Sequence, residues 1–123
     1  MNNAELALII EDDPDLATIF SEAVKAAGFK TEVIHDGDKA LERLNATLPR
    51  VVVLDLHLPR VSGTDILRRI RTDKRLAETQ VIVATADARM AEILHDQADL
   101  VLLKPISFIQ LRTLAARLGS VKE

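Results

Sequence analysis

The chain has 123 residues, a hydrophobic fraction of 48% and a net charge of −3, which suits one globular domain with its own core. It has no cysteine, so disulfides and thiolate metal sites are excluded. Its apolar runs are short, its start lacks a basic signal, and its only aromatic residues are three phenylalanines. We therefore expect no membrane span and no direct nucleic-acid binding. We expect a single domain over residues 1–123, with an ordered core at about 5–119.

Short apolar segments alternate along the chain with segments of helical periodicity. Three of the apolar segments are continuous and rich in β-branched residues, which is typical of strands buried on both faces of a sheet. The predicted strands are 6–10, 30–34, 51–54, 81–84 and 100–103.

Cap residues and apolar spacing place the first four helices. Asp13 is the predicted N-cap of the first helix and Gly28 ends it. A second helix follows Asp36, a third carries its inward face at 66–70, and a shorter fourth begins near Ala88.

The last helix has the clearest start. Ser107 and Gln110 have the spacing of a capping box, and Ile106 with Leu111 has that of a hydrophobic staple. Gly119 is predicted to end this helix. The result is an α/β fold of (βα)5 type, a doubly wound parallel sheet with helices on both faces.

Polar residues stand where the predicted strands end. In a parallel sheet these ends meet at one edge, which is where such folds bind ligands. We call this group the strand-end cluster; it consists of Glu11, Asp12, Asp55, Thr85 and Lys104.

The acids of this cluster need a positive partner. Two carboxylates ~4 Å apart repel by ~4 kcal/mol at an effective dielectric constant of ~20. Lys104 is one candidate partner and a hard divalent cation is the other, since an all-oxygen ligand set suits Mg²⁺. A carboxylate such as Asp55 can act as a nucleophile and form an acyl phosphate, with Thr85 and Lys104 contacting the phosphoryl oxygens.

Four segments of the chain resemble those of two-component response-regulator receivers. They occur in family order and span nearly the whole chain: 8–14 (LIIEDDP), 53–59 (VLDLHLP) followed by Ser62 and Gly63, 82–86 (IVATA), and 103–105 (LKP). The resemblance implies a flavodoxin-like sheet with strand order 2-1-3-4-5 and a cis peptide bond between Lys104 and Pro105.

The resemblance also implies a role for each residue at the strand ends. Asp55 is expected to be the phosphoacceptor and a metal ligand, with Asp12 as a direct ligand, Glu11 acting through a metal-bound water and His57 supplying its backbone carbonyl. Thr85 and Lys104 are expected to hold the phosphoryl group. Mg²⁺ is the expected cation, and Mn²⁺ or Ca²⁺ is an accepted substitute.

Three positions depart from the family pattern or vary within it. Val101 stands three residues before Lys104, where the family usually has an aromatic switch residue. His57 and Asp87 each stand two residues after a site residue, at positions that tune phosphoryl lifetime in the family. Whether His57 and Asp87 position a water molecule or repel it stays open. The other two histidines, His35 and His95, are predicted to be surface residues.

The sequence therefore predicts a signalling module and not a metabolic enzyme, catalysing only its own phosphorylation and dephosphorylation. The expected donor is a histidine kinase or a histidine phosphotransfer protein, and the expected location is the cytoplasm of a bacterial-type cell. The readout face is expected to be the fourth helix, fifth strand and fifth helix, where a homodimer is also an option.

Two other functions stay open as alternatives. The first is a phosphate-independent docking module. Val101 favours this alternative because it replaces the usual aromatic switch residue. The second is an Mg²⁺-dependent phosphatase with an aspartyl nucleophile; such enzymes place an acid where this chain has His57. The downstream effector is not predicted.

Overall fold

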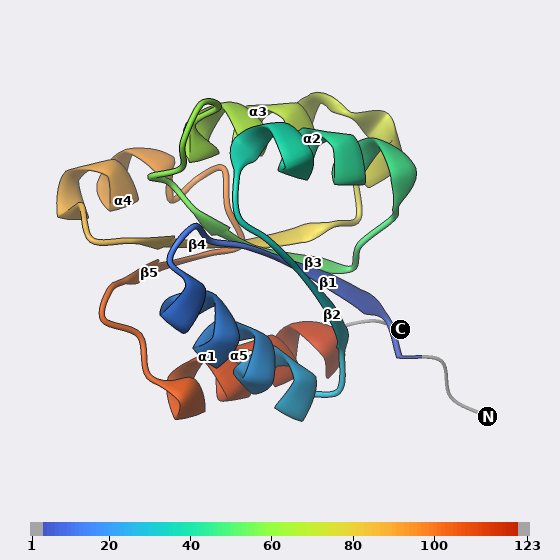
Figure 1. Cartoon of the computed structure of the whole chain (residues 1–123), viewed down its shortest axis with the longest axis vertical. Helices are drawn as coiled ribbons and strands as arrows, with labels where there is room; N and C mark the ends of the chain where they lie inside the picture. The colour runs from blue at the N-terminus through green and yellow to red at the C-terminus, as the bar shows by residue number, and fades with distance from the viewer. Residues whose placement is uncertain (1–3, 121–123) are drawn as a thin grey trace.

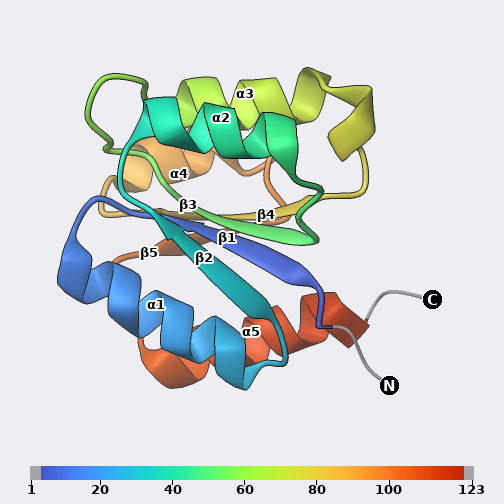
Figure 2. The same ribbon diagram turned by 45° about the vertical axis from the view of Figure 1, so that its right-hand side comes forward.

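The computed structural model describes residues 4–120 and shows a five-stranded parallel sheet between two layers of helices (Figures 1 and 2). The strand order is β2-β1-β3-β4-β5, which confirms the order implied by the family resemblance. Within these residues, none of the helices has the length and apolar character to cross a membrane. The strands are β1 (Leu6–Ile10), β2 (Lys30–Ile34), β3 (Val51–Asp55), β4 (Gln80–Thr85) and β5 (Leu100–Leu103). The helices are α1 (Pro14–Ala26), α2 (Gly37–Ala46), α3 (Gly63–Thr72), η1 (Lys74–Leu76), α4 (Ala88–Leu94) and α5 (Phe108–Ser120).

Alternate residues of the central strands face two separate cores. Leu8 and Val52 pack on one side, under α2, α3 and α4. Ile9 and Val53 pack on the other, under α1 and α5. The continuous apolar runs of these strands are therefore explained by burial on both faces.

The ends of the helices follow the predicted caps. The Asp13 side chain accepts hydrogen bonds from two backbone amides of the first turn of α1, and Gly28 has a positive φ of 107° just beyond the end of that helix. The Ser107 hydroxyl accepts a hydrogen bond from the Gln110 amide at 3.0 Å. One predicted boundary was wrong, because α5 continues through Gly119 to Ser120.

Two strands extend beyond their apolar runs to the polar residues expected at the strand ends. Asp55 and Thr85 are the last residues of β3 and β4. Asp55 is in register with Ala84 of the neighbouring strand. The backbone of both site residues is therefore held by the sheet.

Candidate phosphorylation and metal site

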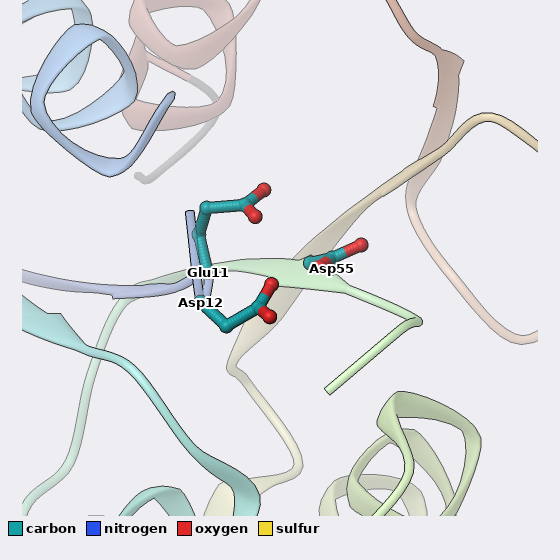
Figure 3. Close-up of side chains that lie close together, drawn as sticks. All are labelled: Glu11, Asp12 and Asp55. Carbon is teal, nitrogen blue, oxygen red and sulfur yellow. The ribbon is translucent and has the colours of Figure 1, made fainter. Parts of the chain in front are cut away.

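Three carboxylates converge at the carboxyl ends of β1 and β3 (Figure 3). Glu11, Asp12 and Asp55 each offer an oxygen, and these oxygens all lie within 4.8 Å of one another. Glu11 and Asp55 are buried, at 1% and 3% exposure, whereas Asp12 is exposed. An all-oxygen donor set of this kind fits a hard divalent cation such as Mg²⁺.

The Lys104 ammonium lies directly against two of these acids. Its Nζ atom is 2.9 Å from Glu11 Oε1 and 3.4 Å from Asp55 Oδ1. The lysine follows β5 and its backbone amide donates to the Thr85 carbonyl at 2.8 Å. The peptide bond to Pro105 is cis, as the family resemblance implied.

Burial and charge act against each other in this group. Burial raises the pKa of Glu11 above its usual value of 4.5, although the hydrogen bond from Lys104 pulls it the other way. Burial alone lowers the pKa of Lys104, but its hydrogen bond to Glu11 and the charges of Asp55 and Glu11 outweigh burial and raise that pKa. Two buried carboxylates, Glu11 and Asp55, share one ammonium group, Lys104. A bound cation would therefore stabilise the ionised form of these carboxylates.

Asp55 is enclosed by its neighbours at the end of β3. The His57 amide and Lys104 both donate to its Oδ1 atom, at 3.2 and 3.4 Å. Among residues 4–120, no hydrogen bond reaches its Oδ2 atom. Only 3% of Asp55 is exposed, so its carboxylate is largely shielded from solvent.

Thr85 is fully buried at the end of β4. Its hydroxyl oxygen accepts a hydrogen bond from the Asp87 amide at 3.0 Å, and a hydroxyl that accepts still has its own proton to donate. Thr85 and Lys104 are tied together through the backbone bond described above. The structure thus brings all five residues of the strand-end cluster to the same edge of the sheet.

One neighbour of the site was missed by the sequence reasoning. His35 was predicted to be a plain surface residue, and it is exposed, but its Nδ1 atom lies 3.0 Å from the Glu11 carbonyl oxygen. The signal was available, because β2 pairs with β1 and the residue after Ile34 must lie beside Glu11. The His57 side chain is exposed.

Comparison with known proteins places the chain in a family. The response regulator receiver domain model matches residues 7–116. The chain therefore belongs to the response regulator receiver domain family, and it is a receiver domain of the kind found in two-component signalling.

Several curated regulators are similar to this chain. It is 34% identical to the DNA-binding response regulator MtrA of Mycolicibacterium smegmatis over 80% of the chain and 43% of that protein. It is 36% identical to the transcriptional regulatory protein TrcR of Mycobacterium tuberculosis over 90% of the chain and 42% of that protein. The chain thus spans less than half the length of these two relatives.

Solved receiver domains have the same fold. The BeF3-activated receiver domain of DrrB, from Thermotoga maritima, superimposes with a TM-score of 0.85 at 25% identity, covering 96% of this chain and 99% of that one. The receiver domain of the Francisella response regulator 1452 gives a TM-score of 0.83 at 27% identity, covering 97% and 99%.

Proposed function

We propose that this receiver accepts a phosphoryl group on Asp55 in a reaction that requires a divalent cation. The observation that carries the proposal is the convergence of Glu11, Asp12 and Asp55 beside the Lys104 ammonium. Asp12, Asp55 and the His57 carbonyl would hold Mg²⁺ directly, Glu11 would act through a bound water, and Mn²⁺ or Ca²⁺ would also fit. When bound, the cation supplies positive charge that offsets the carboxylates and the incoming phosphoryl oxygens.

The protein's own groups then have defined tasks. A carboxylate oxygen of Asp55 attacks the phosphorus of a phosphohistidine donor, the phosphorus–nitrogen bond breaks, and its electron pair stays on the imidazole nitrogen. Lys104 leaves Asp55 Oδ1 and pairs with a phosphoryl oxygen, while the Thr85 hydroxyl donates to another. Catalysis by these groups is positioning and charge stabilisation.

Incubation with acetyl phosphate and Mg²⁺ is expected to add one phosphoryl group to the protein, detected by intact mass. Asp55→Asn is expected to abolish the addition, because an amide is not a nucleophile of this kind. Asp65→Asn, at an exposed acid on α3, is the matched control and should react as the unchanged protein does. Phosphoryl incorporation that persists in Asp55→Asn contradicts the assignment of Asp55 as the phosphoacceptor. If the unchanged protein incorporates no phosphoryl group, the phosphate-independent docking module is the function that remains.

The proposed donor is a histidine kinase or a histidine phosphotransfer protein. Because such donors are charged from ATP inside the cell, a cytoplasmic location goes with this proposal. We also propose that the receiver itself does not bind nucleic acid, since arginines of its α3–η1 region are already paired with acids. These pairs are Arg68–Asp65, Arg69–Asp73, Arg71–Asp99 and Arg75–Asp73.

The proposed readout face consists of α4, β5 and α5, and a homodimer through it is part of this proposal. Val101 on β5 is partly buried and packs against the core beneath α4, which also includes Met90 and Leu94. This side chain has no ring to rotate between an exposed and a buried position. Phosphorylation is therefore expected to change this face less than an aromatic switch does.

NMR of the protein with and without acetyl phosphate tests that expectation. We expect the largest amide shifts at Asp55 and Thr85 and smaller ones around Val101. Val101→Tyr restores a ring at this position and should enlarge the shifts on α4. Large shifts centred on Val101 in the unchanged protein would contradict a muted readout.

A further inference from the structure

The segment from His57 to Ser62 leaves β3 at the site and returns to it at the start of α3. At its beginning, the His57 amide donates to Asp55 Oδ1 at 3.2 Å. At its end, the Gly63 amide donates to the Leu56 carbonyl at 3.1 Å, and a Cβ on Gly63 would lie 2.4 Å from the Asp55 carbonyl oxygen. Both ends of this segment, which we call the β3–α3 loop (57–62), are therefore fixed against the end of β3.

The far part of the β3–α3 loop rests on the first residue of α2. Gly37 is buried there, and a Cβ on it would lie 2.4 Å from the Val61 carbonyl oxygen and 2.6 Å from Val61 Cβ. The closest of these neighbours is a backbone atom, so the loop itself would have to shift. Gly37 has no positive φ, unlike Gly28 at 107°. This position therefore requires glycine only because Val61 approaches it so closely. Figures 1 and 2 show the start of α2 beside the loop that precedes α3.

Arg60 adds a second link between the same two segments. Its φ is 69°, a left-handed conformation that a residue with a Cβ adopts only where its surroundings fix it there. Its guanidinium lies 3.8 Å from Asp36 and 3.9 Å from Asp38, the residues on either side of Gly37. The Arg60 side chain is 68% exposed, so these ion pairs contribute little to stability. The strained backbone indicates that packing, centred on Gly37 and Val61, fixes the shape of the loop.

We propose that Gly37 is a positioning residue for the phosphorylation site, acting through Val61 on the β3–α3 loop. The contact sets how close the loop lies to β3, and with it the His57 amide on Asp55 and the His57 carbonyl that is a proposed metal ligand. Arg60 supports the same contact from the outside. This inference rests on the proposed function, because the loop position affects phosphorylation only if His57 contacts Asp55 and the metal ion as proposed.

Gly37→Ala tests the proposal, since alanine is accepted at a helix start and the added methyl group acts only by pushing on Val61. In the metal-free protein, the amide NMR signals of residues 57–61 are expected to shift. Mg²⁺ affinity, measured by titration, is expected to fall roughly tenfold, as when an outer partner of a metal ligand is lost. The rate of labelling by acetyl phosphate should fall with it.

Gly28→Ala is the matched control for lost stability. Its added Cβ meets nothing within 4 Å, but the backbone there has a φ of 107°, so the variant is strained far from the site. We expect it to lower the melting temperature and leave Mg²⁺ affinity unchanged. Equal losses of Mg²⁺ affinity in the two variants would overturn the proposal, as would Gly37→Ala with unchanged affinity and unchanged loop signals.

Arg60→Gly keeps the proposal testable where Gly37→Ala fails to fold. It removes the outer support and relieves the strained backbone, so the melting temperature should not fall. Loss of a nearby positive charge should by itself strengthen Mg²⁺ binding, whereas a displaced loop should weaken it. We expect Arg60→Gly to bind Mg²⁺ a few-fold more weakly, and stronger binding overturns the proposal.

If the unchanged protein binds no Mg²⁺, the proposed function fails. The loop signals of metal-free Gly37→Ala still test the contact between Gly37 and Val61.

Discussion

Lys104→Met is expected to lower the free energy of unfolding by about 3 kcal/mol at neutral pH, the lower end of the cost of breaking a buried ion pair. The variant leaves Glu11 and Asp55 with their charges and without their ammonium partner, at 1% and 3% exposure. We choose the lower end because Lys104 itself keeps 19% of its side chain exposed, which screens part of the interaction.

Chemical denaturation with and without Mg²⁺ measures this loss. Lys25→Met is the control, because Lys25 pairs with Glu22 at the surface, with 53% and 58% of the two side chains exposed; it should cost well under about 1 kcal/mol. Burial raises the pKa of Glu11, and the variant removes the Lys104 hydrogen bond that opposes this rise. A raised pKa gives stability below the unfolded value that is lost as the pH rises. The deficit of Lys104→Met should therefore shrink toward pH 4.5, the usual value for Glu11, and Mg²⁺ should restore part of it. A loss no larger than that of Lys25→Met would contradict the role given to Lys104.

The general position of the site followed from the sequence because it depends on topology. Strands that alternate with helices must run parallel, so Glu11, Asp55 and Thr85 had to meet at one edge once their strands were recognised. Local sequence patterns also predicted the helix caps correctly. The side chains of Asp13 and Ser107 accept hydrogen bonds from the backbone amides that the patterns predict. Gly119 failed as a stop signal, since a glycine near a helix end is tolerated inside the helix at a cost of only about 1 kcal/mol.

The finer features of the site depend on contacts through space that no local pattern encodes. The position of Lys104 on Glu11, 93 residues away along the chain, is set by side-chain conformation and burial together. The enclosure of Asp55 arises in the same way. The requirement for Gly37 comes from Val61 on a loop whose path is fixed only when α2 and α3 pack against the sheet.

Mg²⁺ is expected to stabilise the receiver by about 2.7 kcal/mol at ~100 times its Kd, by ligand linkage. Asp12→Asn should remove most of this gain, because Asp12 is the one exposed carboxylate of the three and is a proposed direct ligand. Without metal the same variant should be as stable as the unchanged protein or slightly more so, since it removes a negative charge from a crowded cluster. Thermal melts across a Mg²⁺ series measure both effects, with Asp65→Asn as the exposed-acid control. An undiminished Mg²⁺ response in Asp12→Asn would contradict a metal site at these residues.

The Mg²⁺ response should also depend on pH in a defined direction. Burial raises the pKa of Glu11 above 4.5, so without metal its contribution to stability is greatest below 4.5 and is lost as the pH rises through the raised pKa. Mg²⁺ favours the ionised carboxylate, and the increase in melting temperature that it gives should therefore grow as the pH rises from 4.5 toward neutrality. Glu11→Gln removes this titration and should flatten the dependence. A dependence that survives unchanged in Glu11→Gln would contradict its assignment to Glu11.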